Sequence, residues 1–193
     1  MRGLGIRSYH RARGLRKLIV RTKYRATHTS YDELYREEQR SKYDKIVEII
    51  KLDGIVLDLG CGTGLLQEYL AERGYLGKVK TLIGLDLTRE MIMLAKTKIR
   101  KINVDHLIDY IEADAENIPL RQNSTDITIS VTVLNLLEDP CKALEEIDRV
   151  TRHKAVITIL KTTTLKITLA NLKIGVFVGE TDKDYIFVRG IKK

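Results

Sequence analysis

Residues 56–70 read VLDLGCGTGLLQEYL, a hydrophobic run that ends in three closely spaced glycines and continues into an amphipathic segment. A strand that ends in such a turn and opens a helix brings bare backbone N–H groups and a helix N-terminus against a ligand. We therefore expect Gly60, Gly62 and Gly64 to be glycines because side chains there would block the approach of a bound molecule.

Two common nucleotide-binding motifs differ from this turn. The dinucleotide fingerprint GxGxxG has a glycine where this sequence has Leu65, and no Gly-Lys-Ser/Thr follows as in a Walker phosphate loop. Two acidic residues, Asp86 and Asp114, end the next two predicted strands. The carboxyl ends of neighbouring strands form the ligand-binding edge of an open α/β sheet, and a carboxylate after the second strand can accept two ribose hydroxyls.

The rest of the chain alternates short apolar runs with amphipathic segments. This pattern predicts βαβ units around a mostly parallel sheet with helices on both faces. The predicted strands are 55–59, 81–87, 107–113, 126–133, 155–160, 174–179 and 185–190. The predicted helices are 30–50, 65–73, 89–102, 140–151 and a short one near 165–172. The last two strands flank the polar turn ETDKD, so we expect them to pair antiparallel.

Four segments in order, VLDLGCGTG, GLDLT, EADAENIPL and DITISVTVLNLLEDP, resemble the successive motifs of class I S-adenosylmethionine-dependent methyltransferases. The resemblance runs from about residue 55 to residue 160, over half of the chain. It implies a Rossmann-like, seven-stranded, mostly parallel sheet with helices on both faces and an antiparallel C-terminal hairpin. It also implies S-adenosylmethionine as the cofactor.

The resemblance assigns a part of the cofactor to each acidic residue. It implies that Asp58 lies near the methionine amino group and that Asp86 binds both ribose hydroxyls. Asp114, together with the backbone of Ala115, would recognise the adenine amino edge.

The same resemblance places the three glycines along the methionine and ribose. It puts Leu87 beside the adenine ring and makes the segment from Val131 to Leu137 the wall around the sulfonium. The sequence VLNLLEDP departs from the Asn/Asp-Pro-Pro-Tyr/Phe motif of enzymes that methylate exocyclic amines. Asn135 lies in this segment and is a candidate catalytic contact with the acceptor, although a loop hydrogen bond to the backbone is an alternative role.

The excess positive charge lies at the N-terminus. Residues 1–29 hold nine of the 34 basic residues and no acidic one, whereas the rest of the chain is nearly neutral. We divide the chain into a basic N-terminal arm, 1–29, and a methyltransferase domain, 30–193. Such an arm attracts polyanions such as RNA, but a transit peptide or an unordered extension has the same composition.

The predicted function is methylation of RNA or another component of translation. The segment SYDELYREEQRSKYDKI is similar to the entry helix of RNA-modifying methyltransferases that work with a small zinc-binding activator protein, so such a partner is a further expectation. The alternatives are a small-molecule methyltransferase of quinone or metabolite type and a non-catalytic cofactor-binding protein.

Only about a dozen residues separate the fifth strand from the final hairpin, so the cover of the active site must come from the helix at 30–50, the arm or a partner. Tyr31, Tyr35 and Tyr43 are candidates for that cover, with packing against the sheet as the alternative.

Cysteine usage and hydropathy set the remaining expectations. Cys61 and Cys141 form neither a disulfide framework nor a four-ligand metal motif, which predicts a cytoplasmic protein without a metal site. No run of 18 apolar residues is present, so we expect no membrane-spanning helix.

Overall fold

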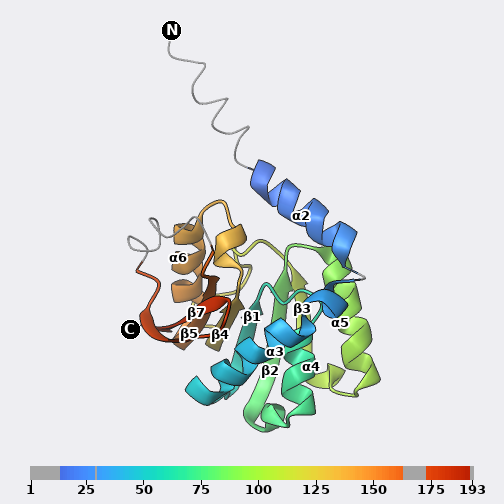
Figure 1. Cartoon of the computed structure of the whole chain (residues 1–193). Helices are drawn as coiled ribbons and strands as arrows, with labels where there is room; N and C mark the ends of the chain where they lie inside the picture. Colours follow the sequence, from blue (N-terminus) through green and yellow to red (C-terminus); the bar gives the residue numbers. More distant parts are fainter. Residues whose placement is uncertain (1–13, 29, 163–172, 192–193) are drawn as a thin grey trace.

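The computed structural model of the chain describes residues 14–28, 30–162 and 173–191. Seven strands form one sheet in the order β3-β2-β1-β4-β5-β7-β6 (Figure 1). The strands are β1 Gly54–Leu59, β2 Val79–Asp86, β3 Ile108–Glu112, β4 Thr125–Val131, β5 Thr151–Leu160, β6 Val176–Glu180 and β7 Asp184–Gly190. The first five are parallel, and β7 pairs antiparallel with both β5 and β6, which confirms the predicted fold class.

Alternate residues of each central strand face opposite sides of the sheet, as the two-residue period of a strand requires. In β1, Val56 packs with the helices α3 (Tyr31–Ile49) and α4 (Leu65–Glu72), whereas Leu57 packs with α6 (Pro140–Val150). Both side chains are fully buried, so helices cover both faces of the sheet. This double burial explains why the central strands are nearly continuous runs of Val, Ile and Leu.

Four helices pack against the sheet close to where the sequence predicts them. They are α3 Tyr31–Ile49, α4 Leu65–Glu72, α5 Arg89–Lys101 and α6 Pro140–Val150, with short 3-10 helices at Tyr75–Lys78, Asp105–Leu107 and Leu134–Leu136. The Asp139 carboxylate caps α6 by accepting a hydrogen bond from the backbone N–H of Lys142 at 3.1 Å. The predicted end of this helix at Thr151 is wrong, because Thr151 already belongs to β5 and pairs with Thr125.

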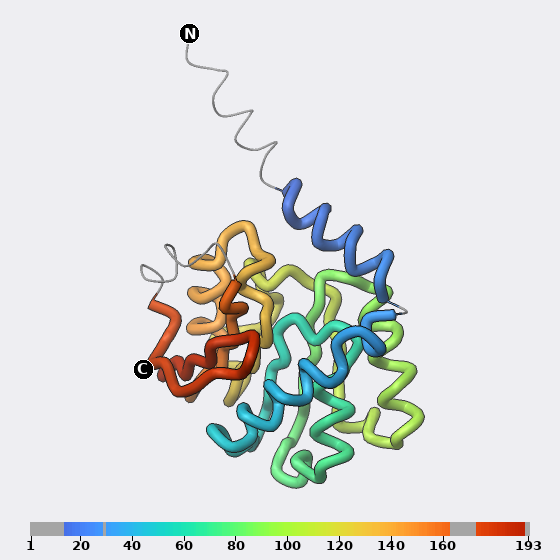
Figure 2. The backbone as a smooth tube through the Cα atoms, in the orientation of Figure 1, coloured from blue at the N-terminus to red at the C-terminus, as the bar shows by residue number. Residues whose placement is uncertain are grey.

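The helix α2, Leu15–Thr27, was not predicted, since its residues were assigned to a basic arm. It lies outside the two helical layers, beyond the carboxyl ends of the strands (Figures 1 and 2). None of its residues is fully buried. The predicted helix near 165–172 and the first thirteen residues of the arm lie outside the described residues. Across the described parts of the chain, no helix has the length and apolarity required to span a membrane.

A buried ion pair connects α3 to the C-terminal hairpin. The Lys42 ammonium lies 2.5 Å from an Asp184 carboxylate oxygen, and both side chains are at most 1% exposed. The same ammonium donates hydrogen bonds to Glu38 at 2.9 Å and to the Thr132 hydroxyl at 3.0 Å. Because a buried charge is tolerated only when it is paired and hydrogen-bonded, this cluster fixes the position of α3 on the sheet.

We expect Asp184→Ala to lower the free energy of unfolding by about 2–4 kcal/mol, because it leaves the Lys42 ammonium buried with one carboxylate instead of two. Urea unfolding followed by circular dichroism measures this change. The control is Asp182→Ala, which removes an exposed carboxylate from the same turn and should have a small effect. Equal losses for the two variants would contradict a stabilising role of the buried pair.

Candidate functional site

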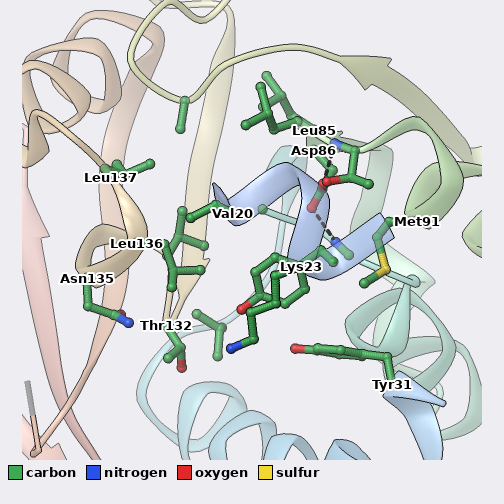
Figure 3. Close-up of a pocket in the computed structure, with 18 of the residues that line it drawn as sticks. Val20, Lys23, Tyr31, Leu85, Asp86, Met91, Thr132, Asn135, Leu136 and Leu137 are labelled. Carbon is green, nitrogen blue, oxygen red and sulfur yellow. Dashed lines mark hydrogen bonds between the residues drawn. The ribbon is translucent and has the colours of Figure 1, made fainter. Parts of the chain in front are cut away.

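A cavity of about 230 Å³ lies at the carboxyl ends of β1, β2 and β4, beneath α2 (Figure 3). The strand order reverses between β1 and β4, and open α/β sheets bind ligands at that point. Among the residues predicted for the site, the cavity is lined by Gly60, Gly62, Asp86, Leu87, Asp114, Ala115, Val131 and Asn135. A smaller recess of about 30 Å³ shares Gly60 and Gly62 with the cavity and is also lined by Asp58.

The three glycines of the turn after β1 have different roles. All have positive φ, which glycine adopts without strain. A Cβ atom at Gly60 would lie 2.3 Å from Val133, and one at Gly64 would lie 2.9 Å from Ala95, so both glycines are needed for packing within the protein. A Cβ atom at Gly62 would meet nothing within 4 Å. Packing within the protein therefore accounts for Gly60 and Gly64, and only at Gly62 would a Cβ atom point into open space. That the turn makes room for a ligand stays a prediction.

The Asp86 carboxylate lies at the centre of the cavity wall. Its Oδ2 accepts a hydrogen bond from the Gly62 N–H at 2.9 Å, and its Oδ1 accepts one from the Thr88 N–H at 2.8 Å (Figure 3). Burial raises the pKa of Asp86, and these backbone N–H groups act in the opposite direction by stabilising the charged form. Each oxygen keeps lone pairs for a ligand, as binding of two ribose hydroxyls would require.

The recess beside the cavity has unpaired hydrogen-bond acceptors. Asp58 accepts a hydrogen bond from the Gln67 amide at 2.9 Å, and burial raises the pKa of its carboxyl to about 7. The side-chain oxygen of Gln39, which lines the recess, is buried without a partner, as is that of Gln67 behind Asp58. Buried acceptors of this kind normally have a donor. An ammonium group supplies three donors, so the recess fits the methionine amino group predicted beside Asp58.

Asp114, at the far end of the cavity, binds a residue of α2. Its Oδ1 accepts a hydrogen bond from the Glu116 N–H at 2.9 Å, and its Oδ2 accepts one from the Lys17 ammonium at 2.7 Å. Lys17 also lies 2.7 Å from the Glu116 carboxylate. Burial opposes the charge of Lys17, but its hydrogen bonds to Asp114 and Glu116 outweigh this effect and raise its pKa.

Ion pairs and hydrogen bonds hold the rest of α2 over the site. Arg21 pairs with Glu112 and Arg25 pairs with Glu90, each at 2.9 Å. The Arg16 guanidinium donates to the backbone oxygen of Asn135 at 2.5 Å. These basic side chains therefore bind acidic groups and a backbone oxygen of the same chain.

Tyrosines enclose the cavity from α2 and α3. The rings of Tyr24 and Tyr31 are 5.9 Å apart, those of Tyr31 and Tyr35 are 4.8 Å apart, and all three line the cavity. Tyr43 instead packs on Tyr69 in the core, with ring centroids 5.5 Å apart. Two of the three tyrosines predicted as a cover thus face the cavity, and the third has the alternative packing role.

Thr132 lies in a strained conformation at the end of β4. Its φ of 61° is uncommon for a β-branched residue, and strain of this kind concentrates at functional sites. The Lys42 ammonium and the Thr158 hydroxyl hold its side chain and backbone. Glu38, which also lines the cavity, receives hydrogen bonds from Lys42 and Lys183; burial opposes its ionisation, but these bonds outweigh burial and lower its pKa.

Sequence reasoning missed the part of the site that α2 provides. Four residues of α2 line the cavity: Lys17, Val20, Lys23 and Tyr24. The spacing of Lys17, Val20 and Tyr24, which is i, i+3 and i+7, was the signal in the sequence that could have predicted one face of a helix. Gln39 was also missed, because a polar residue on a charged helix gives no indication of burial.

A family profile described as "Methyltransferase domain" matches residues 57–159, more than half of the chain. The demethylmenaquinone methyltransferase of Lactobacillus johnsonii is 35% identical over 123 residues, which are 64% of this chain and 49% of that protein. The malonyl-[acyl-carrier protein] O-methyltransferase of Pectobacterium atrosepticum is 32% identical over 130 residues, 66% of this chain and 46% of that protein. The chain thus spans about half the length of these relatives.

The crystal structure of a SAM dependent methyltransferase from Aquifex aeolicus has the same fold, with a TM-score of 0.70. The two chains are 21% identical, and the likeness covers 86% of this chain and 98% of the other. The family match and these neighbours indicate S-adenosylmethionine as the cofactor, in agreement with the acceptors and the open glycine of the cavity. The matched segment includes the glycine turn, Asp86 and Asp114, and on this evidence the chain belongs to the methyltransferase domain family.

Proposed function

We propose that this chain transfers the methyl group of S-adenosylmethionine to a small, largely apolar acceptor. One observation carries the proposal: the part of the cavity lining that is not assigned to the cofactor is mainly aliphatic. It consists mostly of Val20, Val133, Leu136, Leu137 and Leu160. An acceptor held there is covered by α2, so water has little access to the reacting atoms.

The names of the relatives support the same acceptor class. The Lactobacillus relative is named for demethylmenaquinone and the Pectobacterium relative for malonyl-[acyl-carrier protein], so the groups named are a quinone and a malonyl thioester rather than RNA. Our prediction of an RNA substrate is not supported, because the basic side chains of α2 bind carboxylates of the rim. An activator protein remains a prediction, as does any role of residues 1–13.

The chain's own residues would hold the cofactor at three points. Asp58 and Gln39 would bind the methionine ammonium, Asp86 the ribose hydroxyls, and Asp114 the adenine amino group in exchange for Lys17. When bound, S-adenosylmethionine supplies an electrophilic methyl group on a sulfonium. The protein then contributes mainly by positioning the acceptor beside it and by excluding water.

Cofactor binding should depend on pH through Asp58. Because the pKa of this buried carboxyl is about 7, the group is neutral below that pH and cannot pair with an ammonium. We expect the affinity for S-adenosylmethionine, measured by calorimetry, to fall by about tenfold per pH unit below 7 and to level off above 8. The variant Asp58→Asn, which keeps an oxygen for the Gln67 amide, should bind more weakly and without this dependence. A wild-type affinity that is constant from pH 5.5 to 8 would rule out the assigned role.

Two substitutions should separate cofactor binding from acceptor binding. Asp86→Ala is expected to weaken S-adenosylmethionine binding by about a hundredfold, because it removes a buried carboxylate that accepts charge-assisted hydrogen bonds. Asn135→Ala should leave cofactor affinity unchanged, since Asn135 lies on the other side of the cavity. Cofactor binding that survives Asp86→Ala would refute the assignment.

Transfer itself is tested by incubating the protein with methyl-labelled cofactor and fractionated cell extract. We expect label in small apolar compounds or acyl thioesters. Label confined to RNA would overturn the proposed acceptor class, and cofactor binding without transfer to any fraction would indicate a non-catalytic binding protein.

A further inference from the structure

The cavity contains a lysine whose charge is not neutralised by the protein. Two lysines line it, and Lys17 is bound to two carboxylates at 2.7 Å. Within the described residues, no carboxylate oxygen lies within 4.0 Å of the Lys23 ammonium. That ammonium lies over the face of the Tyr24 ring, 5.6 Å from its centroid. Lys23 is exposed as well as lining the cavity, so its ammonium is solvated rather than buried and is available to an anionic ligand that enters the cavity.

Lys23 points into the part of the cavity that the cofactor residues leave open. It lies one turn after Val20 on α2, and Figure 3 shows its ammonium directed inward, toward the wall formed by Thr132 and Asn135. Asp86, by contrast, lies with its two hydrogen bonds on the opposite side of this view. Lys23 is therefore placed to contact an acceptor rather than the ribose.

Asn135 faces the same space with an unsatisfied side chain. The residue is only 9% exposed, and its Oδ1 is buried without a hydrogen-bond partner. Its backbone oxygen is bound by Arg16, so the loop is held without the amide. Among the described residues, the side-chain NH₂ has no hydrogen-bond acceptor, and Figure 3 shows the nitrogen on the cavity side of the residue. An amide NH₂ that no described residue binds can donate to a ligand oxygen in the cavity.

Glu38 also lines the cavity, and it does not favour a cationic acceptor. Lys42 binds one of its oxygens at 2.9 Å and Lys183 binds the other at 2.7 Å, so its charge is compensated. Bound cofactor adds a sulfonium cation to the same cavity. With that second positive charge, the electrostatic balance favours an anion beside Lys23.

We propose that Lys23 and Asn135 form a binding subsite for an anionic oxygen, a carboxylate or a phenolate, carried by the apolar acceptor. This inference rests on the proposed function and names the chemistry of its substrate. Val133, Leu136 and Leu137 would contact the apolar body, while the ammonium and the amide NH₂ donate hydrogen bonds to the oxygen. Lys23 and Asn135 thereby determine which acceptors bind.

The test uses protein saturated with S-adenosylhomocysteine, so that loss of cofactor binding, which would refute the proposed function, is detected separately. Three probes that share an eight-carbon chain are titrated by NMR: octanoate, its neutral methyl ester and octylammonium. The wild type should bind octanoate at least tenfold more tightly than the other two. Lys23→Met should weaken octanoate binding by about tenfold or more, the size expected for one charge-assisted hydrogen bond.

Matched variants distinguish the subsite from a general effect of charge. Lys96→Met removes an exposed lysine of α5 that does not line the cavity and should leave octanoate binding unchanged. Lys23→Arg should restore most of the affinity lost in Lys23→Met, and Asn135→Ala should weaken octanoate but not S-adenosylhomocysteine. Methyl transfer to a malonyl thioester and to a naphthoquinol then separates carboxylate from phenolate acceptors. Equal binding of the three probes, or equal effects of Lys23→Met and Lys96→Met, would overturn the proposal even if the cofactor binds normally.

Discussion

The site depends on the way the turn after β1 is bound to the end of β2. The N–H groups of Gly60 and Cys61 both donate to the Leu85 oxygen, at 2.7 and 3.0 Å, and the next N–H, that of Gly62, donates to Asp86. These bonds require positive φ at the glycines, and they fix the open position at Gly62 next to the carboxylate of Asp86. Substitution at Gly60 or Gly64 would disturb this geometry through the core rather than through the ligand.

Electrostatic interactions determine how the cavity is covered. The ends of the strands present acidic side chains, and α2 presents basic side chains that bind them, so α2 covers the cavity. The same arrangement gives three of the nine basic residues of the arm an intramolecular role, since Lys17, Arg21 and Arg25 bind carboxylates of the chain. Of the two lysines that line the cavity, Lys23 has no carboxylate partner among the described residues.

The sheet and its ligand-binding edge could be predicted from the sequence because strong periodic signals mark them. The apolar runs predict the strands. The acidic residues at the ends of these runs, Asp58, Asp86 and Asp114, predict the ligand-binding edge. The helix α2 could not be predicted in this way, since Leu15, Leu18 and Ile19 are 57–61% exposed and the helix has no buried stripe. Its position follows from contacts between charges about 70 to 100 residues apart, such as Lys17 with Asp114, and a single sequence does not show which charges pair.

The absence of fully buried side chains on α2 has a consequence for the kinetics of binding. The pairs of Arg21 and Arg25 are exposed and contribute roughly 0–1 kcal/mol each, so the helix can detach at a modest cost while the sheet stays folded. Because salt screens such pairs, ligands should enter and leave more often as the ionic strength rises. Exchange of the cofactor for its demethylated product would then proceed through brief local opening, at a rate set by the counterions around the N-terminal helix.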